Sequence, residues 1–309
     1  MDDTTSADRA LRLIRQGRTL RWEGDFQNAR QLLTALGRRT RRPRQLNSLL
    51  IAMTDYEIRL RRAPDVYQAC LEAYGPPDGE RLIPLRELLG VIGAHQLRKR
   101  GIYLPALDTR IHPHYGVFAP TRSEYVALLA NEPLPPAEVA FDIGTGTGVL
   151  AAVLVHKGIR TVIATDNNPR AVECARETLG TRAQVIEADL FPPGRADLIV
   201  CNPPWVPGRP MTVLDTAVYD EDSRMLRGFL HGVRDHLNPG GEAWLILSDL
   251  AELLELRSRA ELLDEFQAAG LEVVGRSSAA PTHRKARNDE TTYLWRLRPS
   301  EAAPFVEEA

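Results

Sequence analysis

The chain has 309 residues, of which 43% are hydrophobic and 26% are charged, so it has ample material for a globular core. Its length predicts one large domain or two unequal domains. The formal charge of −2 provides no global argument for binding nucleic acid or membranes. The acidic, polar start is unlike a signal peptide, and no apolar run approaches a membrane span. We therefore expect a cytoplasmic protein.

The cysteines and histidines do not indicate a metal site. Cys70, Cys174 and Cys201 are scattered and form no Cys-x-x-Cys pair, which is typical of reduced thiols rather than of a disulfide framework or a zinc site. His112 and His114 have no carboxylate or cysteine beside them, so we favour a structural role. The sequence gives no indication of the oligomeric state.

The first hundred residues are predicted to be helical. Apolar residues recur at spacings of three and four over 11–20 and 26–36, which places them on one face of a helix. Further helices are expected over 46–60 and 82–97. We assign residues 1–105 to a helical N-terminal domain that recognises a substrate or partner.

Two basic runs stand out, at Arg38–Arg44 and at His283–Arg287. The first is interpreted as a solvated loop between helices, with a docking patch for phosphate or an acidic partner as the alternative. No recognised RNA-binding module accompanies either run. Nucleic acid is therefore a partner that we consider but do not favour.

Residues 106–137 form a junction that is rich in aromatic residues, histidine and proline. A connector of this composition suggests a gate or a pocket wall, because functional loops are carried on rigid scaffolds. A structural hinge is an equally good interpretation. Tyr115, Phe118 and Arg122 are the candidate substrate contacts in this segment.

From residue 138 onward, strands alternate with helices. Strands are expected over 138–143, 160–165, 183–187, 197–201, 243–247, 271–274 and 291–295, and helices over 123–129, 149–155, 169–179, 223–237 and 253–269. The pattern predicts an α/β fold, a Rossmann-like, mostly parallel sheet of seven strands with helices on both faces. The domain is expected over 138–299, followed by a tail at 300–309.

The first of these strands leads into a glycine-rich turn that opens a helix. Gly144, Gly146 and Gly148 can adopt backbone dihedrals forbidden to other residues and allow a ligand to approach the main chain, with Thr145 between them. A tight connection without a ligand is the alternative. Val149 stands where a dinucleotide motif has its last glycine, and no P-loop lysine is present, so nicotinamide and nucleoside triphosphates are disfavoured.

Acidic residues at three strand ends narrow the ligand. Asp166 lies 18 positions after Gly148, where a carboxylate can accept hydrogen bonds from ribose hydroxyls, and Asn167 follows it. Asp189 can accept from an adenine amino group while Leu190 packs on the ring. Asp142, at the end of the first strand, can meet a cationic ammonium group.

The fourth strand ends in Asn202-Pro203-Pro204-Trp205. Consecutive prolines fix the backbone and leave carbonyls without local donors. Asn202 can accept from an NH₂ group through its side-chain oxygen and Pro203 through its main-chain oxygen, while Trp205 offers a flat face to a planar substrate. Pro204 is a further substrate contact. A structural Asn-Pro turn is the alternative interpretation.

These motifs together resemble the class I S-adenosylmethionine-dependent methyltransferases over residues of roughly 110–297. Within them the chain is similar to the branch with an Asn-Pro-Pro-aromatic motif, which includes the HemK/PrmC protein-glutamine methyltransferases, the "small" methyltransferase domains, and enzymes that methylate amino groups of DNA and ribosomal RNA. The resemblance implies S-adenosylmethionine as cofactor, S-adenosylhomocysteine as product, and in-line methyl transfer to nitrogen. Asn202, Pro203 and Trp205 are the implied catalytic residues, and Asn202 also borders the cofactor.

The chain departs from the glutamine methyltransferases on the substrate side. Where they typically carry Pro-Arg-Pro-x-Thr-Glu, this chain has Ala-Pro-Thr-Arg-Ser-Glu at 119–124, and Trp205 replaces the commoner tyrosine. A glutamine-like protein side chain is the first hypothesis for the methyl acceptor. A small molecule of secondary metabolism and ribosomal RNA are the alternatives, and a non-catalytic protein is disfavoured by the intact motif at 202–205. The loop at 206–219 fits a substrate lid and an inert surface loop equally well.

Overall fold

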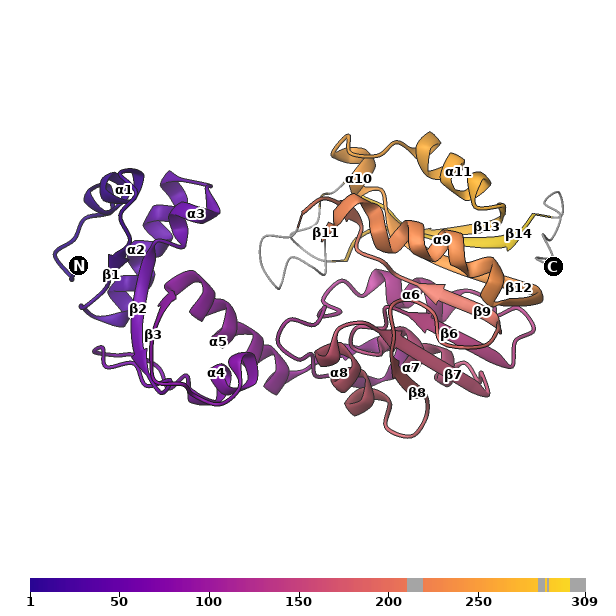
Figure 1. Ribbon diagram of the computed structural model, residues 1–309, viewed down its shortest axis with the longest axis horizontal. Helices are drawn as coiled ribbons and strands as arrows, with labels where there is room; N and C mark the ends of the chain where they lie inside the picture. The colour runs from indigo at the N-terminus through magenta and orange to yellow at the C-terminus, as the bar shows by residue number, and fades with distance from the viewer. Residues whose placement is uncertain (210–218, 283–286, 288, 301–309) are drawn as a thin grey trace, which may run out of the picture. The chain divides into compact units, whose positions relative to one another are not determined.

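The computed structural model describes residues 1–209, 219–282, 287 and 289–300. The chain divides into two compact units, Met1–Arg100 and the remainder from Gly101, here called unit 1 and unit 2. Figure 1 labels the elements of both units, and α5 (Leu85–Arg100) is the last element of unit 1. Each is described by itself.

Unit 1 combines five helices with a three-stranded sheet of order β1-β2-β3. The helices are α1 (Ala7–Arg15), α2 (Phe26–Arg39), α3 (Pro43–Leu46), α4 (Tyr67–Tyr74) and α5 (Leu85–Arg100), and the strands are β1 (Leu20–Arg21), β2 (Leu49–Thr54) and β3 (Glu80–Pro84). The helix predicted over 46–60 is wrong, because β2 occupies its centre. Alternate residues of β2 are buried, but a six-residue apolar run fits a strand and a helix equally well from its sequence alone.

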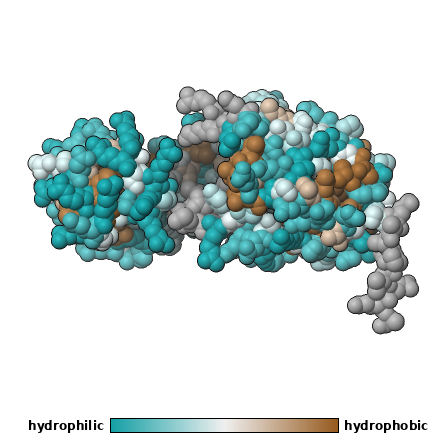
Figure 2. All heavy atoms as spheres, turned by 90° about the horizontal axis from the view of Figure 1, so that it is seen from above, coloured by the Kyte–Doolittle hydropathy of each residue, from teal (hydrophilic) through white to brown (hydrophobic). Residues whose placement is uncertain are grey.

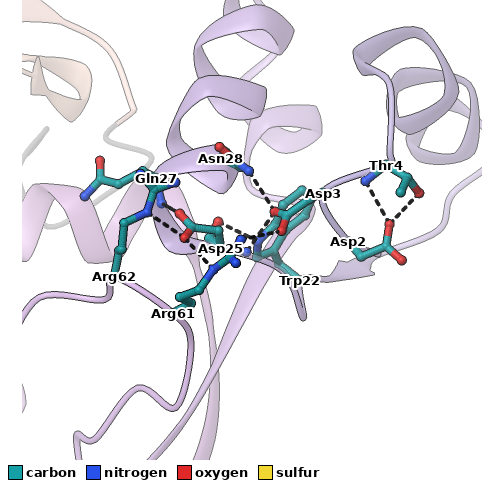
Figure 3. Close-up of polar contacts among 9 residues, drawn as sticks. All are labelled: Asp2, Asp3, Thr4, Trp22, Asp25, Gln27, Asn28, Arg61 and Arg62. Atoms are coloured by element: carbon teal, nitrogen blue, oxygen red, sulfur yellow. Dashed lines mark hydrogen bonds and ion pairs between the residues drawn. The ribbon is translucent and has the colours of Figure 1, made fainter.

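A buried aspartate ties the loops of unit 1 to α2. Asp25 caps this helix by accepting a hydrogen bond from Gln27 N at 2.9 Å, and its Oδ2 accepts from Arg61 Nε and Arg62 Nε at 3.1 and 2.6 Å (Figure 3). The hydrogen bond from Arg62 is the largest cause that lowers the pKa of Asp25 to about 2. Asp3 Oδ1 accepts from Asp25 N at 2.8 Å, which fastens the start of the chain to the same point.

Unit 2 contains a seven-stranded sheet of order β13-β14-β12-β9-β6-β7-β8. Its strands are β6 (Val139–Ile143), β7 (Thr161–Asp166), β8 (Gln184–Glu187), β9 (Ala196–Cys201), β12 (Leu237–Ser248), β13 (Leu271–Ala279) and β14 (Thr292–Pro299). Strand β14 runs antiparallel to both of its neighbours, whereas the pairs from β12 to β8 are parallel. The predicted mostly parallel sheet is confirmed.

Helices cover both faces of this sheet. They are α6 (Glu124–Asn131), α7 (Val149–His156), α8 (Pro169–Leu179), α9 (Arg224–His236), α10 (Leu250–Leu253) and α11 (Arg259–Ala268), and the short elements are β4 (Ile102–Leu104), η1 (Pro105–Leu107), β5 (Thr109–Ile111), β10 (Val206–Pro207), β11 (Tyr219–Asp220) and η3 (Glu221–Ser223). Helices α6, α7 and α8 pack in sequence, and α9 packs against α11. The helix predicted over 253–269 begins instead at Arg259, because Ser258 and Glu261 form a capping box there.

The parallel strands bring their carboxyl ends to one edge of the sheet. Ile143 pairs with Thr165 of β7 on one side and with Cys201 of β9 on the other, so the residues that follow these strands emerge side by side. Both central strands are buried almost throughout. Within the described part of the chain, no helix is long and apolar enough to cross a membrane.

Candidate active site

The glycine-rich turn is built from left-handed backbone. Gly144, Gly146 and Gly148 have φ values of 68°, 56° and 79°, which other residues adopt at a cost. The turn is fastened to β7, since Gly146 N donates to Asp166 Oδ2 at 2.9 Å. A Cβ at Gly148 would lie 3.2 Å from Ala175 Cα, so the third glycine allows α8 to pack closely. The first two glycines line a cavity, whereas the third is absent from its described lining.

Asp142 lies behind this turn and holds it in place. Its Oδ2 accepts from Thr145 Oγ1 at 2.6 Å and from Ala151 N at 3.0 Å, which joins the turn to the first residues of α7. Its Oδ1 is buried and has no hydrogen-bond partner among the described residues. Burial raises the pKa of Asp142 to about 6. Asp142 is not among the described residues that line the cavity.

Asp166 faces the cavity at the end of β7, as predicted, together with Asn167. Its Oδ2 accepts from Gly146 N, and its Oδ1 accepts from Asn168 N at 2.9 Å. Burial raises the pKa of Asp166 despite these donors. The side chain therefore connects two backbone turns while it borders the cavity.

The segment after β8 brings Asp189 and Leu190 to the same cavity. Asp189 Oδ2 accepts from Arg224 Nη2 at 2.6 Å, and both side chains are exposed. Leu190 has a φ of 74°, which is strained for a residue other than glycine, and Thr165 Oγ1 donates to its carbonyl oxygen at 2.5 Å. Leu190 Cδ1 would lie 2.6 Å from a Cβ at Gly228, so that glycine makes room for it on α9.

The asparagine after β9 is held by the tryptophan three residues later. Trp205 Nε1 donates a hydrogen bond to Asn202 Oδ1 at 2.8 Å, which fixes the orientation of the side-chain amide. The guanidinium carbon of Arg122 lies 4.7 Å from the Trp205 ring centroid, within the range of a cation–π interaction. Asn202 Oδ1, the predicted hydrogen-bond acceptor, thus has a partner within the protein, and so does the Trp205 ring, the predicted stacking surface.

Arg122 belongs to a buried ion network. Its Nε donates to Glu124 Oε1 and its Nη2 to Glu290 Oε1, each at 2.8 Å, and both glutamates are buried. Ser248 Oγ donates to Glu290 Oε1 at 2.5 Å, and Thr282 Oγ1 donates to Glu124 Oε2 at 2.9 Å. Burial alone would raise the pKa of Glu124, but the hydrogen bond from Arg122 and its other donors outweigh it and lower that pKa. The network joins α6, β12 and the segments on either side of the 283–286 stretch.

These groups surround a cavity of about 390 Å³. Most of the predicted site residues line it: Phe118, Arg122, Gly144, Thr145, Gly146, Asp166, Asn167, Asp189, Leu190, Asn202, Pro203, Pro204 and Trp205. Tyr115 is not among the described lining residues, and the guanidinium carbon of Arg170 lies 5.6 Å from its ring centroid. Three predicted segments lie partly outside the described residues. They are residues 210–218 of the loop at 206–219, residues 283–286 of the second basic run, and the tail from residue 301.

The structure adds lining residues that the sequence analysis did not propose. Arg224, Met225 and Leu250 border the cavity, and a Cβ at Gly144 would lie only 2.2 Å from Met225 Cε. Glu290 supports the site from behind. These residues follow no motif, because they reach the site through the packing of α9, α10 and the β13–β14 connection. No sequence signal could have identified Glu290, because it comes close to Arg122 only in the folded protein.

The histidines of the junction have structural partners. His114 is buried, and its Nε2 lies 2.8 Å from Glu177 Oε2 on α8. In the portions of the chain that the structure describes, no group of three histidine, cysteine, aspartate or glutamate side chains is arranged to hold a metal.

The sheet order, the glycine turn and the strand-end carboxylates define a class I S-adenosylmethionine-dependent methyltransferase. The cavity volume lies in the range of small-molecule and cofactor sites, and Asp166 and Asp189 line it at the ends of successive strands, where ribose and adenine groups would need acceptors. The unpartnered Asp142 Oδ1 supplies buried negative charge beside the turn. The residues present therefore fit this cofactor.

The family model of the methyltransferase small domain matches residues 108–269. The chain belongs to this family. Among curated relatives, the release factor glutamine methyltransferase of Mycolicibacterium smegmatis is 40% identical over 119 residues, covering 35% of this chain and 41% of the relative. The enzyme of the same name from Mycobacterium leprae is 32% identical over 158 residues, covering 47% and 50%. The chain thus spans half or less of the length of these two relatives.

Among solved structures, a methyltransferase from Pyrococcus furiosus aligns with 69% of this chain and 98% of its own, at 20% identity and a TM-score of 0.44. The fold of the present chain is defined by its own strand order.

Proposed function

We propose that this protein methylates the side-chain amide nitrogen of a glutamine in a protein substrate. The observation that carries the proposal is the position of Asn202 and Trp205, at the end of β9 and on the wall of the cavity. The names of the two bacterial relatives support glutamine as the acceptor. The proposed cofactor contacts are the residues predicted from the sequence: Asp142, Gly144, Thr145, Gly146, Gly148, Asp166, Asn167, Asp189, Leu190 and Asn202.

The chemistry requires two acceptors beside a weak nucleophile. S-adenosylmethionine supplies a methyl group on a sulfonium. An amide nitrogen attacks it poorly because its lone pair is delocalised. Asn202 Oδ1 has two lone pairs, and Trp205 Nε1 uses one of them, so the oxygen retains capacity for a substrate N–H. With the Pro203 carbonyl as second acceptor, the site would favour the positive charge that develops on nitrogen.

The surroundings of Trp205 favour a narrow acceptor over a nucleobase. The guanidinium of Arg122 lies against the Trp205 ring, and it is held there by two buried glutamates. A base that stacked on the covered part of the ring would have to displace this paired cation from its carboxylates. A glutamine side chain needs only to present its amide edge to Asn202. Ribosomal RNA and small aromatic metabolites are therefore less favoured acceptors.

The domain scheme completes the proposal. We infer that the N-terminal domain, predicted over 1–105, takes part in recognising the substrate protein, and that the junction at 106–137 contributes Phe118 and Arg122 to the acceptor side. The enzyme is proposed to act in the cytoplasm.

The experiment combines labelled S-adenosylmethionine with candidate acceptors in one assay. Purified protein is incubated with a release factor, with ribosomal RNA and with a low-mass extract, and mass spectrometry locates the added methyl group. We expect N-methylglutamine in protein. Label in RNA or in low-mass material would contradict the proposed acceptor, and failure to bind the cofactor in calorimetry would contradict the site itself.

The matched variants are Asn202→Ala and Asn131→Ala. Asn131 is exposed at the end of α6, away from the described cavity lining. Loss of a preorganised polar contact to the transition state is expected to lower kcat by roughly a hundredfold or more while cofactor binding persists. Unchanged kcat in Asn202→Ala would remove this residue from the mechanism.

A further inference from the structure

The formal charge of −2 conceals a separation of charge between the two units. Residues 1–100 contain 19 lysines and arginines against 12 aspartates and glutamates, a formal charge of +7. The remaining 209 residues contain 20 against 29, a formal charge of −9. A basic unit attached to an acidic catalytic unit suggests that unit 1 has an anionic partner of its own.

The positive charge of unit 1 gathers on three helices that pack together. Helix α1 with the turn after it, the end of α2, and α3 with the connection before it carry nine exposed arginines. These residues, here called the arginine face, are Arg9, Arg12, Arg15, Arg18, Arg38, Arg39, Arg41, Arg42 and Arg44. The only carboxylate of these segments is Asp8, whose Oδ1 lies 2.9 Å from Arg39 Nε and so joins α1 to the end of α2.

Most of the arginine face is not used by the fold. Elsewhere in unit 1, Arg61 and Arg62 are bound by Asp25, as Figure 3 shows, and Arg81 is paired with Asp78. In contrast, the ion pairs among the described residues include none from Arg38, Arg41, Arg42 or Arg44. Helix dipoles favour arginines in the last turns of α1, α2 and α3, but they do not account for Arg41 and Arg42, which precede α3.

The composition of the face distinguishes phosphate from an acidic peptide. An arginine fork binds carboxylate and phosphate oxygens alike, so the nine arginines establish only that the partner is anionic. Protein docking surfaces also need apolar or aromatic anchors, yet none of the exposed large apolar residues that the structure describes lies within residues 1–46. Figure 2 likewise shows mostly hydrophilic side chains over unit 1 on the face in view.

We propose that the arginine face binds the phosphate backbone of RNA. Without exposed aromatic side chains for base stacking, the contacts are to phosphate and carry little sequence preference. The acidic unit 2 repels the same polyanion, which confines the contact to unit 1. Binding of this kind would hold the enzyme near a protein substrate that is itself bound to RNA. The proposal does not depend on the identity of the methyl acceptor.

The test measures binding of the full-length protein to a fluorescent single-stranded RNA by anisotropy over a range of salt concentrations. The variant Arg38→Gln, Arg41→Gln, Arg44→Gln removes three cations of the face. The control Arg21→Gln, Arg59→Gln, Arg86→Gln removes three exposed arginines elsewhere in unit 1. On a single strand, loss of three phosphate contacts should reduce the slope of log affinity against log salt by about two. The control variant should keep the wild-type slope.

Two further measurements decide the outcome. A poly-glutamate peptide serves as the competing acidic polymer, and phenylglyoxal footprinting of the wild type shows which arginines RNA protects, even if a variant folds poorly. Protection of residues 38–44 and a reduced slope support the proposal. Equal slopes in both variants, no protection of these arginines, or tighter binding of poly-glutamate than of RNA would overturn it.

Discussion

The two walls of the cavity are built in different ways. The wall that we propose holds the cofactor, here called the cofactor wall, consists of Gly144–Gly146, Asp166, Asp189 and Leu190, and backbone geometry determines its shape. The Asp166 carboxylate is bound by main-chain N–H groups, and the turn depends on positive φ angles. The wall that we propose faces the methyl acceptor, here called the acceptor wall, consists of Arg122, Asn202 and Trp205, and it is held by side chains that bind one another.

The two walls also differ in how far apart their bonded residues lie along the chain. The bond between Gly146 and Asp166 spans 20 positions, whereas the bond between Arg122 and Glu290 spans 168. Strand ends and their backbone turns can form the same cofactor site in many proteins, because their geometry depends little on the surrounding side chains. A wall made of long-range side-chain contacts changes with a few substitutions, and we therefore propose that acceptor specificity is set there.

The largest expected effect is on the acceptor wall. Arg122→Ala would leave Glu124 and Glu290 as buried carboxylates without their cation, and we expect the free energy of unfolding to fall by about 3–5 kcal/mol. Denaturant unfolding measures this loss. Arg209→Ala, which removes an exposed ion pair with Glu221, should leave the free energy of unfolding nearly unchanged. Equal losses in the two variants would show that the network does not stabilise the fold.

The free energy of unfolding should depend on pH through Asp142, which holds the glycine turn from behind. Its folded pKa of about 6 exceeds the ordinary value of 3.8, so the folded protein binds a proton more tightly than the unfolded chain. The stability that this proton contributes is fully present below the ordinary pKa and is lost as the pH rises through about 6, by up to about 3 kcal/mol. Asp142→Asn should lack this decrease. Parallel stability curves of wild type and variant between pH 4 and 7 would contradict the assignment.

Carboxylates on the cofactor wall should differ in their effect on cofactor binding. Asp166 is partly buried and accepts two backbone hydrogen bonds, so Asp166→Ala should weaken binding by about 10- to 100-fold, equivalent to about 1.5–3 kcal/mol. Asp189 is exposed and paired with Arg224, and Asp189→Ala should weaken binding less than tenfold. Calorimetry with S-adenosylmethionine measures both. A stronger effect at Asp189 would reverse the expected order.

The smallest effect concerns the bond that orients Asn202. Trp205→Phe keeps an aromatic ring and removes the indole donor, which is worth about 0.5–1.5 kcal/mol, so kcat/KM should fall by roughly 2- to 10-fold. Cofactor affinity should stay at the wild-type value. An unchanged kcat/KM would show that the proline-fixed backbone alone orients the asparagine.

Sequence patterns determined the catalytic unit because their signals are local. The glycine turn, the alternation of strands and helices, and the prolines after β9 each constrain the backbone within a few residues, and the parallel sheet then brings the strand ends to one edge. For the same reason, the short apolar run at 49–54 was assigned to the wrong element, since its strand partners β1 and β3 lie elsewhere in the chain.

Only the tertiary structure decided how the acceptor wall is held. No spacing in the sequence relates Arg122 to Glu290, or Glu124 to Thr282, because these pairs depend on how α6 and the β13–β14 connection pack. Trp205 and Asn202 are only three positions apart in the sequence, but their hydrogen bond forms only when both side chains adopt the observed orientations. In this chain, local backbone motifs place the residues proposed for the cofactor, whereas long-range packing positions Arg122 beside Trp205.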